Sequence, residues 1–249
     1  MPVAIIAGTA IYNIPGKTLK AETIETPYGS ALIYRVEGNA EDLIFLARHG
    51  ITHDTPPHKI NYRANIKALE MMGVKRVLAT NAVGSINKEI PPLGLALLTD
   101  FLDFTSGRKH TFFDGGDSGV KHVDVSIPYC PVLNKQLLAL APTFDIKLHP
   151  EAVYVCTNGP RLESPAEIRM YARMGGDVIG MTGIPEATLA RELGLCYSAV
   201  AFSVNWAAGI EKTIRFVGNS KGFDKIKTNI LGLFIETLKT TSDADCFDL

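Results

Sequence analysis

Short runs of consecutive apolar residues alternate along this chain with longer segments in which apolar residues recur at helical spacing. Val3–Ala7 and Leu43–Ala47 are runs of the first kind, and we expect each to form a buried β-strand. Within residues 60–72 the apolar positions follow one face of a helix, which we expect to end at Gly73. The same criteria predict strands at 77–80, 95–99, 152–156, 178–179 and 196–204, helices at 131–141, 164–173, 184–193 and 223–238, and a long exposed loop at 103–119.

Strands that alternate with helices predict an α/β fold, in which helices surround a mostly parallel sheet. No internal repeat or linker divides the chain, so we expect residues 1–249 to form a single domain. In such sheets, ligands bind beyond the carboxyl ends of the strands. The residues that follow the predicted strands are Gly8 and Thr9, Arg48 and His49, Asn81 and Ala82, 157–163, Met181 and Thr182, and Asn205.

Composition narrows the classes of function. The chain is 46% hydrophobic and 20% charged, as in ordinary folded proteins, and its net charge of −1 provides no basic surface for a nucleic acid. No apolar stretch approaches the roughly 20 residues of a membrane-spanning helix, and the N-terminal run lacks the basic leader of a signal peptide. The four cysteines lie far apart without a CxxC pair. We therefore expect neither a zinc site nor a disulfide framework, and a reducing cytoplasm fits this cysteine usage.

Several predicted strand ends carry groups that suit a small anion. Gly8 and Thr9 offer a hydroxyl and backbone amides. We expect a tight loop at 82–85, and the small residues of 81–85 have amides that can approach an oxyanion. Arg48 supplies a guanidinium suited to phosphate, and Thr182 adds a hydroxyl. Neither segment matches a dinucleotide fingerprint or a P-loop. The pattern therefore favours a free anion such as phosphate over a dinucleotide or a nucleoside triphosphate.

The motifs at these strand ends resemble those of the trimeric purine nucleoside phosphorylase and methylthioadenosine phosphorylase family. The resemblance spans nearly the whole chain, and its MTG-x-PEA form is similar to that of the bacterial S-methyl-5′-thioinosine phosphorylases. The matching segments are Gly8 and Thr9, ARHG at 47–50, PHKINYRAN at 57–65, TNAVGS at 80–85, NGPRLE at 158–163, MTGIPE at 181–186, and the strand that ends at Asn205.

This resemblance implies a mixed, partly barrel-like sheet of the nucleoside phosphorylase type, a homotrimer, and inorganic phosphate as co-substrate with no cofactor or metal. It implies that phosphate is bound by Thr9, Arg48, His49, Asn81, Ala82 and Thr182. It implies that the nucleoside is bound by Leu162, Glu163, Met181, Asn205, Phe223 and, from a neighbouring subunit, His122. At Leu162 relatives commonly have phenylalanine stacked on the purine, so this chain offers an apolar contact without ring stacking.

The residue types at Glu163 and Asn205 predict a 6-oxopurine base. An ionised Glu163 only accepts hydrogen bonds, so it can pair with the N1 proton of hypoxanthine or guanine but not with the N1 lone pair of adenine. The amide of Asn205 can donate to O6 and accept a proton that arrives at N7. Relatives that act on 6-aminopurines place aspartate at the Asn205 position and lack the Glu163 carboxylate.

One further residue bears on the 5′ group of the nucleoside. Phe223 is the best match to a residue that contacts this group, and relatives that act on unmodified nucleosides often carry histidine there. An apolar Phe223 favours a methylthio group, hence S-methyl-5′-thioinosine, although the residue could equally anchor a helix. Four alternatives stay open: a phosphorylase of inosine or guanosine, a methylthioadenosine phosphorylase, a nucleosidase that uses water, and a non-catalytic nucleoside-binding module.

Overall fold

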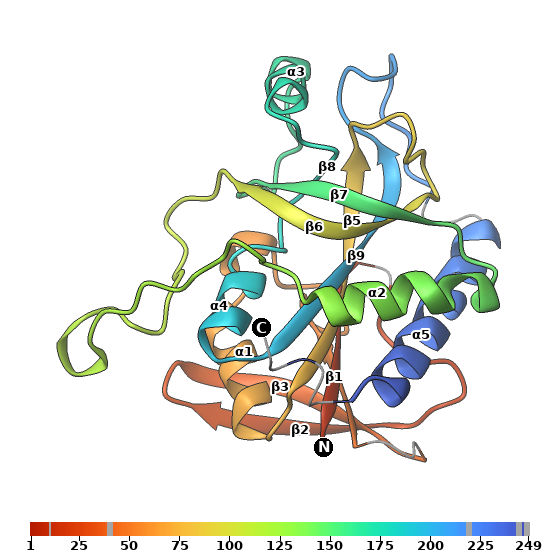
Figure 1. The fold of residues 1–249 in the computed structure, drawn as a ribbon. Helices are drawn as coiled ribbons and strands as arrows, with labels where there is room; N and C mark the ends of the chain where they lie inside the picture. Colours follow the sequence, from red (N-terminus) through yellow and green to blue (C-terminus); the bar gives the residue numbers. More distant parts are fainter. Residues whose placement is uncertain (10, 39–41, 218–220, 243–245, 247–249) are drawn as a thin grey trace.

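A nine-stranded sheet forms the centre of the protein, with helices α1 and α4 on one side and α2 and α5 on the other (Figure 1). This computed structural model describes residues 1–9, 11–38, 42–217, 221–242 and 246. The strands are β1 (Val3–Ala7), β2 (Leu19–Thr26), β3 (Gly29–Val36), β4 (Leu43–Ala47), β5 (Arg76–Ser85), β6 (Leu95–Asp103), β7 (Leu148–Cys156), β8 (Val178–Gly180) and β9 (Cys196–Trp206). The helices are α1 (Tyr62–Met71), α2 (Pro131–Leu140), α3 (Pro165–Arg173), α4 (Glu186–Glu192) and α5 (Lys221–Thr240), with 3₁₀ turns at Pro57–Lys59, Gly116–Ser118 and Ala141–Phe144.

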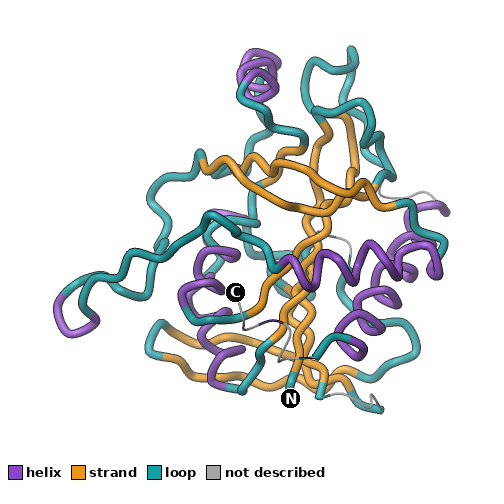
Figure 2. The backbone as a smooth tube through the Cα atoms, in the orientation of Figure 1, coloured by secondary structure: helices purple, strands orange, loops and turns teal. Residues whose placement is uncertain are grey.

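The strand order confirms a mixed and partly barrel-like sheet. The strands lie in the order β2-β3-β4-β1-β5-β8-β7-β6-β9, and a further pairing of β5 with β9 closes the second half into a ring (Figure 2). Strand β1 is parallel to β4 and β5, β5 to β9, and β7 to β6 and β8. The hairpin β2–β3 and the pairs β3–β4, β5–β8 and β6–β9 are antiparallel.

Local sequence explains where several helices begin. Asn61 caps α1 by accepting a hydrogen bond from the backbone N–H of Ala64, and the apolar face of this helix is buried. Ser164 and Glu167 form a reciprocal capping box at the start of α3, directly before Pro165 in the first turn. In the described residues, no helix is both long and apolar enough to span a membrane.

One expected loop is a strand. The prediction of a strand at 77–80 followed by a tight loop at 82–85 was wrong, because β5 continues without interruption to Ser85. Residues 81–85 pair in parallel with β9, and the register shifts between Val83 and Gly84. A side chain on Gly84 would lie 3.2 Å from Nδ2 of Asn205, so glycine lets the two strands approach closely. The small residues that suggested a turn instead permit this close strand pairing.

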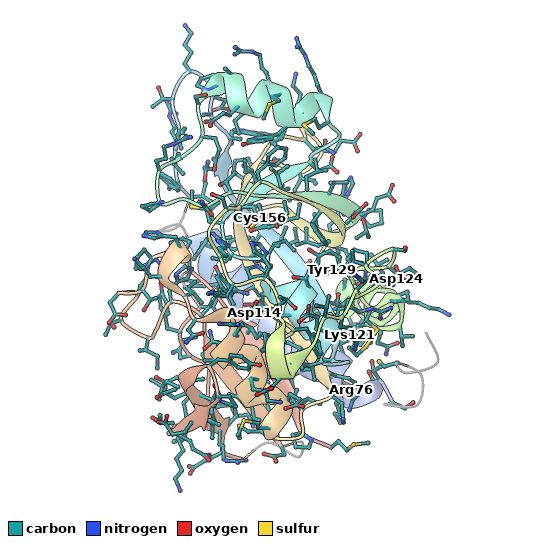
Figure 3. All side chains as sticks on the ribbon, turned by 90° about the vertical axis from the view of Figure 1, so that its left-hand side faces the viewer. Arg76, Asp114, Lys121, Asp124, Tyr129 and Cys156 are labelled. Carbon is teal, nitrogen blue, oxygen red and sulfur yellow. A yellow bond between two sulfur atoms is a disulfide. The ribbon has the colours of Figure 1, made fainter. Side chains whose placement is uncertain are left out.

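The sequence predicted no disulfide framework, but one pair of cysteines is bonded. Cys130 and Cys196 form a disulfide, and Sγ of Cys246 lies 3.8 Å from that of Cys130. The backbone N–H of Cys130 donates to the carbonyl of Tyr197, so the segment before α2 runs beside the start of β9. Sequence separation carries no information about such proximity. Cys156 is buried in the sheet, where desolvation raises the pKa of its thiol to about 11; Figure 3 shows its place among the side chains.

Candidate active site

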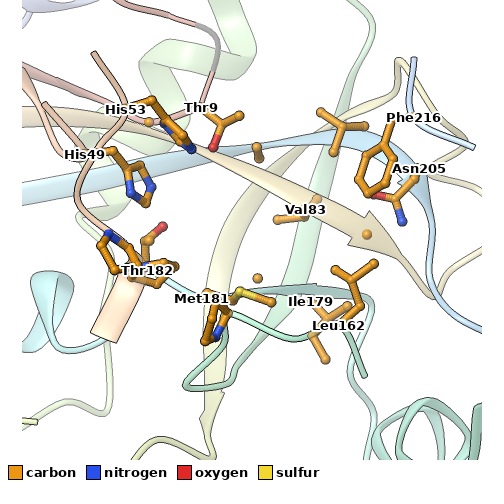
Figure 4. Close-up of a pocket in the computed structure, with 18 of the residues that line it drawn as sticks. Thr9, His49, His53, Val83, Leu162, Ile179, Met181, Thr182, Asn205 and Phe216 are labelled. Carbon is orange, nitrogen blue, oxygen red and sulfur yellow. The ribbon is translucent and has the colours of Figure 1, made fainter. Parts of the chain in front are cut away.

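A cavity of about 830 Å³ opens beyond the carboxyl ends of β1, β4, β5, β8 and β9 (Figure 4). Its volume falls within the range of small-molecule sites. Most of the predicted site residues line it together, although they come from widely separated parts of the chain. These lining residues are Thr9, Arg48, His49, Ala82, Leu162, Glu163, Met181, Thr182, Asn205 and Phe223.

Arg48 is fixed by a buried ion pair. Its Nε and Nη2 each donate to a carboxylate oxygen of Glu186 over 2.7 Å, and Nη1 donates to the carbonyl of Thr80 over 3.0 Å. Burial alone would lower the pKa of Arg48, but the charge of Glu186 outweighs it and the pKa is raised. A guanidinium has five N–H groups. Arg48 therefore remains charged, in a fixed orientation, with N–H groups left for an anion in the cavity.

His49 faces the cavity as a neutral ring. Desolvation and the nearby charge of Arg48 lower its pKa to about 4, although its bond with the carbonyl of Thr55 opposes this shift. Nδ1 lies 2.8 Å from that carbonyl oxygen, which can only accept, so Nδ1 carries the proton. Nε2 is then an acceptor at neutral pH. It can accept a hydrogen bond from a partly protonated oxyanion.

Thr182 and Asn81 form a second pair at the same end of the cavity. Nδ2 of Asn81 donates to Oγ1 of Thr182 over 3.2 Å, so the hydroxyl proton of Thr182 is left to donate elsewhere. The backbone N–H of Thr182 donates to the hydroxyl of Tyr154, which fixes the residue. Asn81 itself is fully buried and does not line the cavity. The structure thus places Asn81 behind the anion end, as a support for Thr182.

Glu163 and Asn205 lie at the other end of the cavity. The hydroxyl of Thr157 donates to Oε1 of Glu163 over 2.7 Å, which orients the half-buried carboxylate. Nδ2 of Asn205 donates to the carbonyl of Trp206 over 2.7 Å, and only 4% of Asn205 is exposed. Leu162 and Ile179 provide apolar surface across from Asn205 (Figure 4). This end therefore combines a carboxylate and a carboxamide with an apolar wall, as a flat polar heterocycle requires.

Comparison with known proteins decides the family. Residues 2–231 match the family model described as the phosphorylase superfamily. The chain belongs to this superfamily. It is 51% identical over 215 residues to a probable 6-oxopurine nucleoside phosphorylase of Moorella thermoacetica, covering 86% of this chain and 82% of that protein. It is 47% identical over 216 residues to a probable S-methyl-5′-thioinosine phosphorylase of Methanopyrus kandleri, and the match covers 86% of this chain and 82% of that protein.

Solved structures agree with the fold. Methylthioadenosine phosphorylase from Schistosoma mansoni in complex with tubercidin superposes with a TM-score of 0.89 at 27% identity, covering 99% of this chain and 95% of that one. The expectation of a nucleoside phosphorylase fold is therefore confirmed. In this phosphorylase, the strand ends that suggested an anion site do converge on one cavity.

The cavity also contains residues that the sequence did not single out. His53, Pro56, Pro57, Ile214 and Phe216 contribute to its lining. Phe216 lies beside Asn205 and is 63% exposed (Figure 4). Glu186 was quoted within a motif but received no role, because its partner Arg48 lies 138 positions away. Only the three-dimensional structure shows that these residues belong to the site.

His122 lies outside this cavity. It lines a smaller one of about 310 Å³ with Asp103, His110, Lys121 and Glu192. Among the described residues, the cysteines Cys130, Cys196 and Cys246 form the only group of three or more His, Cys, Asp or Glu close enough to share a metal ion, and they do not line the main cavity.

Proposed function

We propose that this phosphorylase cleaves the glycosidic bond of 6-oxopurine nucleosides with inorganic phosphate. The observation that carries the proposal is one cavity with Glu163 and Asn205 at one end and the Arg48–Glu186 pair, His49 and Thr182 at the other. The names of the relatives from Moorella thermoacetica and Methanopyrus kandleri support it.

The proposed reaction is a direct displacement. The bond between C1′ and N9 breaks while a phosphate oxygen forms the new bond to C1′, giving the free base and a pentose 1-phosphate. Negative charge develops on the purine, and a proton from solvent arrives at N7, where Oδ1 of Asn205 accepts it as a hydrogen bond. Glu163 holds the N1 proton and so the orientation of the base. Arg48 and Thr182 hold the phosphate in line, which removes the entropy of a two-body encounter. We propose no cofactor or metal beyond phosphate.

S-methyl-5′-thioinosine is the substrate we propose first, with inosine and guanosine as the second candidates. Phe223 lines the cavity with an apolar ring that packs on Phe202, with ring centroids 4.8 Å apart. This ring offers no hydrogen bond to a 5′-hydroxyl but gives apolar contact to a methylthio group.

Two proposals are tested by initial rates of hypoxanthine release from S-methyl-5′-thioinosine and from inosine, measured with and without phosphate. These are the dependence on phosphate and the preference for the methylthio substrate. We expect no release from either nucleoside without phosphate, and a kcat/KM about 10-fold higher for S-methyl-5′-thioinosine than for inosine, from burial of one methylthio group. The variant Phe223→His should narrow this ratio. Equal or faster turnover of inosine would contradict the methylthio preference. Release of hypoxanthine in phosphate-free buffer would indicate a nucleosidase. Faster turnover of methylthioadenosine would indicate a 6-aminopurine phosphorylase, and nucleoside binding without turnover would indicate a non-catalytic module.

We also propose a homotrimer in which His122 completes the neighbouring subunit's site. The segment that carries His122 extends away from the body of the protein (Figure 1), and Val120 and Ile127 on it are 75% and 51% exposed. Exposed apolar residues on an extended segment suit an interface between subunits. A sedimentation mass of one chain would overturn this proposal; a mass of three chains, together with lower activity of His122→Ala, is the expected result.

A cytoplasmic location is also our proposal, since phosphate and nucleosides are the expected substrates there. The Cys130–Cys196 disulfide removes the support that cysteine usage had given, although intracellular proteins of hyperthermophiles carry such bonds. Cell fractionation that recovers the protein outside the cytoplasm would contradict it.

A further inference from the structure

Arg108 lies near the start of the long segment between β6 and α2, which is largely exposed. Its own side chain turns inward and is half-buried, in contrast to its neighbours Gly107 and Lys109. It does not line the main cavity. Its guanidinium stacks over the ring of Tyr62, with Cζ 5.4 Å from the ring centroid.

The guanidinium of Arg108 donates to backbone carbonyls of two separate loops. Nη2 donates to the carbonyls of Thr157 over 3.1 Å and Asn158 over 3.2 Å, which follow β7. It also donates to the carbonyl of Met181 over 2.8 Å, and Nη1 donates to that of Ile184, in the loop that follows β8. Loop carbonyls that leave a sheet need donors, and one planar, charged group supplies them here for both loops.

These two loops carry opposite ends of the proposed site. The loop after β7 leads to Glu163, and the hydroxyl of Thr157 itself donates to the Glu163 carboxylate. The loop after β8 contains Met181 and Thr182 and leads into α4, whose first residue Glu186 holds Arg48. Arg108 is therefore placed to set the position of the base-binding carboxylate relative to the anion-binding groups.

A second contact seats the same segment on the first loop. The side chain of Asn158 accepts from the backbone N–H of Ser106 over 3.2 Å and donates to the Ser106 carbonyl over 3.1 Å. Residues 106–108 thus dock on residues 157–158 through two independent sets of hydrogen bonds. The position of Arg108 is defined by this docking and does not depend on the cavity being filled.

We propose that Arg108 is a positioning residue of the phosphorolysis reaction, which aligns the loop carrying Glu163 with the loop carrying Met181 and Thr182. This inference rests on the proposed function. A displacement of about 1 Å between reacting groups can lower a rate about 100-fold. Loss of Arg108 should therefore act on turnover more than on the affinity for either substrate alone.

The test compares Arg108→Ala and Arg108→Lys with the wild type in phosphate-dependent hypoxanthine release from S-methyl-5′-thioinosine. We expect kcat to fall about 30- to 100-fold in Arg108→Ala, with KM for phosphate changed less than about threefold. Millimolar guanidinium chloride should restore part of the rate in Arg108→Ala only. Arg108→Lys should remain impaired, since an ammonium cannot span both loops. Rescue by guanidinium is a readout that a general loss of folding would not produce.

Arg63→Ala is the matched control. Arg63 also stacks on a tyrosine, Tyr28, and anchors the same segment further along by bonding the carbonyl of Thr111 and the carboxylate of Asp114. It does not reach the carbonyls of the two site loops, so we expect kcat to stay within about threefold of the wild type. If Arg108→Ala unfolds at a markedly lower temperature than the wild type, the kcat of Arg108→Lys is compared with that of the wild type instead. Wild-type kcat in the Arg108 variants, or an equal loss in Arg63→Ala, would overturn the proposal. No turnover by the wild type would instead refute the proposed function.

Discussion

Asn205→Asp is expected to shift the base preference of the enzyme toward 6-aminopurines, while Glu163 still disfavours the N1 lone pair of adenine. We expect kcat/KM for inosine-type nucleosides to fall about 100-fold, and the ratio of 6-aminopurine to 6-oxopurine turnover to rise by at least as much. Asn205 is 4% exposed, so a mispaired group there cannot turn to water. An aspartate carboxylate would face O6, another acceptor, whereas it can accept from the N6 amino group of adenine. One such mispairing costs about 1–3 kcal/mol, which is about 5- to 150-fold in rate.

Steady-state kinetics on S-methyl-5′-thioinosine and methylthioadenosine provide the measurement. Asn205→Ala is the control, because it removes donor and acceptor together and should lower turnover of both substrates without raising the ratio of 6-aminopurine to 6-oxopurine turnover. The assignment of Asn205 to the base would be wrong if the aspartate variant lost activity on both substrates with an unchanged ratio.

Arg48→Met is expected to reduce both stability and the use of phosphate. Arg48 and Glu186 are joined by two hydrogen bonds of 2.7 Å, and their side chains are 0% and 1% exposed. Removing the arginine alone leaves a buried carboxylate without a counter-charge, so the free energy of unfolding should fall by about 3–5 kcal/mol. Loss of the anion's principal donor should lower kcat/KM for phosphate by about 10²–10³-fold.

The double variant Arg48→Met, Glu186→Leu separates these two effects. With both charges replaced by apolar side chains, most of the lost stability should return. The use of phosphate should not return, because the donor is still missing. Urea unfolding and phosphate titration of the rate measure the two quantities independently. If the double variant recovered both, Arg48 would serve only the fold and the anion site would lie elsewhere.

The sequence predicted best those strands that are buried on both faces. Strands β1 and β4 are buried on both faces and appear as continuous apolar runs, so their bounds were predicted correctly. The hairpin β2–β3 was missed, because β2 alternates half-buried and exposed positions and carries charged residues such as Lys20 and Glu22. The extension of β5 through 81–85 depends on pairing with β9, which local propensity does not contain.

The site was predictable to the extent that it follows from strand ends. A parallel arrangement brings the carboxyl ends of strands together, so Arg48 and Asn205 could be placed in one site from the sequence. The supporting contacts could not be found in this way: Glu186 and Arg108 received no role, and Asn81 was expected to bind phosphate directly. Glu186, Asn81 and Arg108 act through contacts with residues far away in the chain, and an isolated carboxylate, amide or guanidinium in a sequence does not reveal its partner.

The most direct test of the account is a crystal structure of the enzyme with phosphate and a non-cleavable 6-oxopurine nucleoside analogue. We expect a carboxylate oxygen of Glu163 within about 2.7–3.2 Å of N1, the amide of Asn205 at O6 and N7, and phosphate against Arg48 and Thr182. A base bound with Glu163 and Asn205 turned away from it, or phosphate remote from Arg48, would contradict the account.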